Sequence, residues 1–160
     1  MRHAWMTVAA LAAVMLALPG RAEDKDEGEA YEFKTVLKAF DGGPKEAGEK
    51  ALATKEDWKE FIKSCAGEEV RAALEKVEVD FEKEVLIAVA LGERVDHLSK
   101  GEKEEEGISK VTMKGDAWTI HYTVVSSDCL EGSSWPVFVI RVPKLTQTFT
   151  FKRKDVFYGG

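Results

Sequence analysis

The sequence of 160 residues is poor in the residues from which many catalytic and metal sites are built, with two cysteines, three histidines and no asparagine. So few thiols and imidazoles leave little from which to form a zinc site or an imidazole-based catalytic centre. The absence of asparagine excludes N-linked glycosylation, which needs an Asn-x-Ser/Thr acceptor. We therefore expect a protein that is not an enzyme and that binds neither a metal nor a cofactor.

Basic residues are also in the minority, 23 against 29 acidic ones, which gives a formal charge of −6. This charge argues against a nucleic-acid-binding surface or a polybasic membrane patch as the main function. With 44% hydrophobic residues, the chain is long enough to bury the core of one domain.

The longest apolar run lies near the N-terminus, over residues 4–18, directly after a basic start. A membrane-spanning helix needs about 20 apolar residues, and Gly20 and Ala22 supply the small residues of a signal-peptidase site. The pattern predicts a signal peptide over residues 1–22, and hence a secreted or periplasmic protein without a stable membrane anchor. An uncleaved anchor is the alternative.

Cleavage after Ala22 would remove two arginines and no acidic residue, so the formal charge would become −8. Residues 23–30 are predicted to be an acidic flexible tail, followed by a single domain over residues 31–158. In an oxidising compartment, Cys65 and Cys129 are expected to form a disulfide, which would stabilise the fold by about 2–5 kcal/mol. A reactive thiol at Cys129 is the alternative.

The first half of the domain reads as strands followed by helices. Alternation over residues 31–38 predicts a strand, and residues 48–53 are expected to complete a hairpin with it. Thr54 and Asp57 resemble a capping box, so a helix is predicted from Lys55 to just before Gly67. Its buried stripe, at helical spacing, comprises Trp58, Phe61, Ile62 and Cys65, and a second helix is predicted over residues 68–76.

The second half reads mainly as strands. The apolar run over residues 85–91 predicts a central strand buried on both faces. Residues 93–107 are expected to form an exposed connection, because a run of acids is typical of a solvated loop. A calcium site formed by Glu102, Glu104, Glu105 and Glu106 is the alternative. A hairpin is predicted over residues 108–125. Further strands are predicted at residues 136–142 and 146–152. The predicted fold is α+β, with a mainly antiparallel β-sheet and one or two short helices packed on one face.

The segment 126–136 stands out as a predicted loop that ends with Trp135 before Pro136. A tryptophan in a loop held by a disulfide is a candidate anchor for a partner protein, so Trp135, Pro136 and Leu130 are predicted partner-binding residues. Packing of Trp135 over the sheet edge is the alternative.

Three segments of the chain, residues 54–61, 79–92 and 135–144, resemble the family named for the C-terminal domain of the protease complex subunit PrcB. The resemblance is incomplete, because members usually carry a Gly-Gly-Tyr segment shortly after the glycine that corresponds to Gly92. It implies an extracytoplasmic, non-catalytic accessory subunit that stabilises another secreted protein, in the named case a protease.

Two other functions remain open from the residues themselves. A small apolar ligand could occupy a pocket lined by aromatic side chains, with Trp58, Phe61, Trp118 and Phe138 as the predicted lining. An enzyme could be centred on His121 with a serine or aspartate of residues 126–134, although His121 is expected to be a surface or edge residue of its strand.

Overall fold

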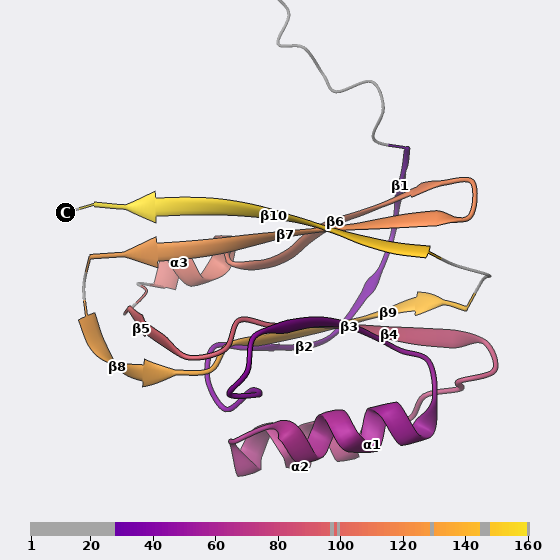
Figure 1. Cartoon of the computed structure of the whole chain (residues 1–160), viewed down its shortest axis with the longest axis horizontal. Helices are drawn as coiled ribbons and strands as arrows, with labels where there is room; N and C mark the ends of the chain where they lie inside the picture. The colour runs from indigo at the N-terminus through magenta and orange to yellow at the C-terminus, as the bar shows by residue number, and fades with distance from the viewer. Residues whose placement is uncertain (1–27, 97, 99, 129, 145–147, 160) are drawn as a thin grey trace, which may run out of the picture.

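In the computed structural model, which describes residues 28–96, 98, 100–128, 130–144 and 148–159, two β-sheets and a pair of helices form three layers (Figure 1). Sheet A has the strand order β1-β6-β7-β10, and sheet B has the order β2-β9-β4-β3. The predicted signal peptide lies outside the described residues.

The strands of sheet A are β1 (Glu29–Tyr31), β6 (Gly107–Lys114), β7 (Ala117–Ser127) and β10 (Thr148–Tyr158). Those of sheet B are β2 (Lys34–Ala39), β3 (Gly48–Leu52), β4 (Glu84–Ala90) and β9 (Val137–Pro143). Strands β5 (Arg94–Asp96) and β8 (Leu130–Ser134) pair as a two-stranded ribbon. The helices are α1 (Lys55–Ser64), α2 (Glu68–Glu75) and α3 (Lys100–Glu105).

Sheet B is the middle layer and is buried on both faces. Val85 and Ile87 of β4 belong to the core between the two sheets, together with Trp118 of β7. The alternate residues Leu86 and Ala88 belong to the core under α1 and α2. A strand with two buried faces needs a continuous apolar run and not an alternating pattern. The predicted central strand over residues 85–91 is confirmed as β4.

Both predicted helices are confirmed. The capping box at the start of α1 is complete, since the Asp57 N–H donates to Thr54 Oγ1 at 3.1 Å and the Thr54 N–H donates to Asp57 Oδ2 at 3.2 Å. Trp58, Phe61 and Ile62 are buried against sheet B, which places α1 and α2 on the face of that sheet opposite sheet A (Figure 1).

The α+β class is confirmed, but two strand pairings differ from expectation. The predicted strand at residues 48–53 forms, yet β3 pairs with β4 and not with β2. Strand β10 does not pair with β9, which precedes it in the sequence, but pairs in parallel with β7. The reason is burial: β9 is apolar on both faces and so belongs in the middle layer, whereas β10 alternates Thr and Phe at its start, as suits a strand with one buried face.

Three stretches predicted to be irregular contain regular structure. Residues 93–107, expected to be an exposed connection, contain β5, α3 and the first residue of β6, and Glu106 among them is only 1% exposed. Residues 29 and 30 of the predicted tail belong to β1 and pair with β6. In the predicted loop 126–136, β7 continues to Ser127 and β8 pairs with β5, so only short links remain.

Candidate functional site

A hollow of the surface is lined by residues of α1, of β3 and of the turn before β3. Its deeper part has a volume of about 390 Å³ and is lined by Lys45, Phe61 and Ala90, among others. A second hollow, bounded by Leu52 and Glu60, adjoins it, and Lys50 and Phe61 line both. We call the two hollows together the β3–α1 groove.

The edge of β3 that borders this groove is open. β3 is the last strand of sheet B, and within the described part of the chain it pairs only with β4, over the full length Gly48–Leu52. An edge strand presents unused N–H and C=O groups on alternate residues, which can pair with another extended chain. The groove therefore has a hydrogen-bonding side, β3, and a side-chain wall, α1.

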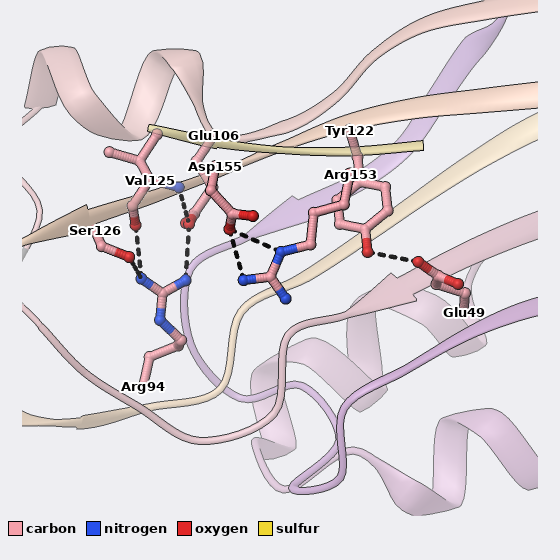
Figure 2. A network of polar contacts seen from close by, with 8 residues as sticks. All are labelled: Glu49, Arg94, Glu106, Tyr122, Val125, Ser126, Arg153 and Asp155. Carbon is pink, nitrogen blue, oxygen red and sulfur yellow. Dashed lines mark hydrogen bonds and ion pairs between the residues drawn. The ribbon is translucent and has the colours of Figure 1, made fainter. Parts of the chain in front are cut away.

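Glu49 fixes β3 to sheet A from the other side. Its Oε1 accepts a hydrogen bond of 2.5 Å from the Tyr122 hydroxyl of β7 (Figure 2). Burial, followed by the hydrogen bond and charge of Glu49, raises the pKa of Tyr122 to about 12, so the phenol stays protonated and donates at neutral pH. Since Glu49 faces sheet A, Lys50 and Leu52 at alternating positions face the helix layer, and Lys50 lines the groove.

The turn that closes the deep end of the groove is held by backbone contacts. The Gly67 N–H donates to the Gly42 carbonyl at 2.8 Å, and the Ala66 N–H donates to the Gly43 carbonyl at 3.0 Å. An added Cβ at Gly43 would lie 2.6 Å from the Trp135 carbonyl oxygen, so only glycine allows this approach. The turn before β3 is thereby fixed to the end of α1 and to the link after β8.

Trp135, predicted as a partner anchor, is half-buried beside this end of the groove. Its N–H donates to Asp41 Oδ1 at 3.0 Å and its carbonyl accepts from the Gly43 N–H at 2.7 Å. The Lys45 ammonium group lies 5.7 Å from the centre of the indole ring, a cation–π distance. The ring therefore positions a lysine that lines the groove, which the sequence alone did not indicate.

The two ends of the groove differ in charge. Lys45 and Glu46 line the hollow near Gly48, and Lys50 lines both hollows. Asp57 and Glu60 line the end near Leu52. With Lys50 counted in both hollows, the lining side chains carry a formal charge of +1 at the Gly48 end and −1 at the Leu52 end, and the buried residues Phe61 and Ala90 form part of the floor.

A second polar cluster lies away from the groove, where β7 extends beyond β6. Arg94 Nη1 lies 3.2 Å from Glu106 Oε1, and Arg94 Nη2 donates to the Val125 carbonyl at 2.6 Å (Figure 2). The Glu106 carboxylate is completely buried, so this ion pair is part of the interior. Because it holds the α3 connection to β7, we assign it to the scaffold and not to a ligand site.

The structure does not bring together the other predicted ligand or catalytic sites. Sheet B separates Trp58 and Phe61 on its helix side from Trp118 on its other side, so the predicted four-aromatic pocket is wrong; of the four, only Phe61 lines the groove. His121 Nε2 lies 3.3 Å from Thr112 Oγ1, on the face of β7 opposite Ser126. Five residues of strand separate His121 from Ser126, about 17 Å.

The remaining predicted site residues are two partner-binding residues and the two cysteines. Pro136 is buried, and its carbonyl accepts from the Leu91 N–H at 3.0 Å. The Leu130 backbone pairs with Asp96 in the β5–β8 ribbon. Cys65 is a buried thiol whose Sγ donates to the Phe61 carbonyl. Cys129 lies outside the described residues, so the disulfide stays a prediction.

In the described ranges no three His, Cys, Asp or Glu side chains gather as metal ligands would, and no helix there has the length and hydropathy to cross a membrane. The chain matches no family model, and no curated protein or solved structure is significantly similar to it.

Proposed function

We propose that this chain is a non-catalytic interaction domain that binds an extended segment of another protein along the β3–α1 groove. The observation that carries the proposal is the combination of an open strand edge with a helix-walled hollow alongside it. In strand addition, the backbone of the edge strand supplies affinity and the adjoining pockets select alternate side chains. The five residues of β3 would pair with about 16 Å of extended chain.

The setting of the partner follows from the sequence. The predicted signal peptide places the domain in the periplasm or the medium, so the partner is another secreted or periplasmic protein. The resemblance to the PrcB family supports an accessory role of this kind, and it implies a secreted protease as the partner. Trp135, which the sequence singled out, contributes by holding Lys45 at the end of the groove.

A small apolar ligand is the second candidate function. The deep hollow, at about 390 Å³, lies within the range of small-molecule sites, about 300–1,000 Å³. A small molecule would use the hollow but would leave the β3 edge unpaired, so the two functions differ in whether the β3 backbone takes part.

The test uses Gly48, which lines the groove and where an added Cβ meets no atom within 4 Å. Gly48→Trp should fill the hollow without disturbing the core, and Gly101→Trp on α3 is the matched control, since a Cβ there also meets nothing within 4 Å. The protein, expressed from its full-length sequence, would be used with each variant to capture partners from its own extracytoplasmic fraction. Each captured partner would then be cut into peptides and the binding peptide identified.

We expect a stoichiometric partner that is retained by the parent and by Gly101→Trp and is lost with Gly48→Trp. In the amide NMR spectrum of the domain, its binding peptide should shift the resonances of Gly48–Leu52. A partner that binds Gly48→Trp as well as the parent would place the interface elsewhere and refute the groove proposal. Recovery of a small molecule, with β3 amides unshifted, would favour the second candidate.

A further inference from the structure

We infer that the segment bound in the β3–α1 groove carries a carboxylate, placed at the Gly48 end, and runs antiparallel to β3. This inference rests on the proposed function and adds the chemistry and the direction of the bound chain. It is drawn from the charges at the two ends of the groove and from the apolar floor between them.

The basic end of the groove is suited to an anion. Among the described residues, no carboxylate forms an ion pair with Lys45 or Lys50, although the protein as a whole is acidic. Lys45 is held at 5.7 Å from the Trp135 ring, which limits the freedom that it would lose on binding. Lys45 and Lys50 outnumber Glu46 among the residues that line this hollow, so its net positive charge is complementary to a side-chain or C-terminal carboxylate.

The floor next to these lysines suits an apolar side chain. Phe61, Ala66 and Ala90 line the deep hollow, and Phe61 is itself only 3% exposed, so its ring is fixed by the core. Small alanines leave the volume that a branched aliphatic side chain would fill. A residue of this type, one or two positions from the carboxylate, would place both groups at once.

The acidic end sets the direction. Asp57 is already engaged in the capping box with Thr54, whereas Glu60 is exposed one helical turn along α1. A basic residue or the N-terminal part of the bound segment is favoured there. With its carboxylate near Gly48 and its N-terminal side near Leu52, the segment runs opposite to β3, and antiparallel pairs are also slightly more stable.

A second copy of the chain is a poorer occupant of this edge. Antiparallel pairing of two β3 strands about Lys50 would place the two lysines directly opposite each other, which is destabilising. The charge pattern therefore favours a different chain over self-association.

The test uses three N-acetylated peptides with the domain expressed from its full-length sequence. The first, Lys-Ser-Thr-Val-Thr-Val-Leu, has a free C-terminus. The second is its C-terminal amide. The third is an amide with Leu-Glu as its last two residues, so that the carboxylate is on a side chain. Titrations followed by amide NMR report whether the β3 resonances shift and how tightly each peptide binds.

We expect both carboxylate peptides to shift the amides of Gly48–Leu52 and to bind about fivefold or more tightly than the plain amide. The double variant Lys45→Gln/Lys50→Gln should remove this preference. Lys59→Gln/Lys63→Gln, which makes the same charge change on exposed positions of α1, should keep it. Tighter binding of the peptide with the free C-terminus than of the glutamate peptide would show that the groove prefers a C-terminal carboxylate to a side-chain carboxylate.

The outcomes distinguish failure of the carboxylate inference from failure of the strand-addition proposal. Equal binding of the amide and carboxylate peptides, with β3 shifts in each case, would overturn the carboxylate inference and leave the strand-addition proposal standing. No β3 shift with any peptide at millimolar concentration would overturn both. Concentration-dependent dimerisation through β3, without peptide, would show that the edge binds a second copy instead.

Discussion

Arg94 and Glu106 together occupy the place that a neighbouring strand would take along β7. Strand β6 begins at Gly107, opposite Thr123, so it provides no backbone partner further along β7 at Val125. There the Val125 N–H donates to Glu106 Oε1 at 3.1 Å, and the Val125 carbonyl accepts from Arg94 Nη2 at 2.6 Å. One buried ion pair thus satisfies both backbone groups of a residue that is itself fully buried.

Glu106→Ala is therefore expected to destabilise the protein by about 3–5 kcal/mol, because it removes the buried carboxylate that pairs with Arg94 and accepts from the Val125 N–H. Urea unfolding followed by circular dichroism measures the change. Lys83→Ala, which breaks the exposed pair between Lys83 and Asp80, is the control and should change the midpoint little. An equally small effect of Glu106→Ala would show that this carboxylate does not hold the α3 connection.

The double variant Arg94→Met/Glu106→Leu checks the same mechanism. Removing both charges leaves no uncompensated ion, so the loss of stability should be smaller than for Glu106→Ala alone. The Val125 N–H and carbonyl would still lose their partners, so full recovery is not expected. A double variant that is less stable than the single one would contradict the assignment of the cost to a buried charge.

Gly43→Ala should destabilise the protein by about 1–3 kcal/mol and loosen the turn that closes the groove. The added Cβ would lie 2.6 Å from the Trp135 carbonyl oxygen and 2.7 Å from Val137 Cβ, and both neighbours are held by the fold. Gly101→Ala on α3 is the control, expected to be neutral or slightly stabilising, because its Cβ meets nothing and alanine favours helix. Thermal unfolding of the two variants side by side measures the difference.

How far the sequence predicts this fold depends on whether the signal is local. The capping box of Thr54 and Asp57 and the apolar run of β4 are carried by neighbouring residues, and both predictions are confirmed. Which strands pair is decided by partners distant in the chain. β3 therefore joins β4 instead of β2, and β10 joins β7 in parallel, although each strand itself was visible.

The same distinction applies to the candidate site. A charged run was interpreted as a solvated loop because charge predicts exposure, yet Glu106 is buried by pairing with Arg94, twelve residues earlier. Trp135 was recognised as unusual from the sequence, but its neighbour Lys45 lies ninety residues away. The β3–α1 groove could not be predicted at all, since it depends on β3 being the last strand of its sheet.

The hydrogen bond between Tyr122 and Glu49 should contribute to the stability of the fold in a way that depends on pH. The pKa of Tyr122 is raised from 10.0 to about 12, so folding favours the neutral phenol. This contribution is fully present below pH 10 and is lost as the pH rises from about 10 to about 12. Tyr122→Phe should lower stability by about 1 kcal/mol at neutral pH and make the fall in stability above pH 10 less steep. Urea unfolding at several pH values tests this; an unchanged slope above pH 10 would contradict it.

The reactivity of Cys65 tests both the core and the predicted disulfide. Burial raises the pKa of the Cys65 thiol to about 11, with a smaller opposing effect from Arg71, so almost no thiolate is present at pH 8. Alkylation by iodoacetamide in the native protein should be more than about 100-fold slower than for an exposed thiol with a pKa of about 8.5. If Cys65 is a free thiol, denaturation without reductant should then make it react at once. Rapid labelling of Cys65 itself in the native protein, located by peptide mass spectrometry, would contradict its burial, whereas a Cys65 that reacts only after denaturation with reductant would establish the bridge to Cys129.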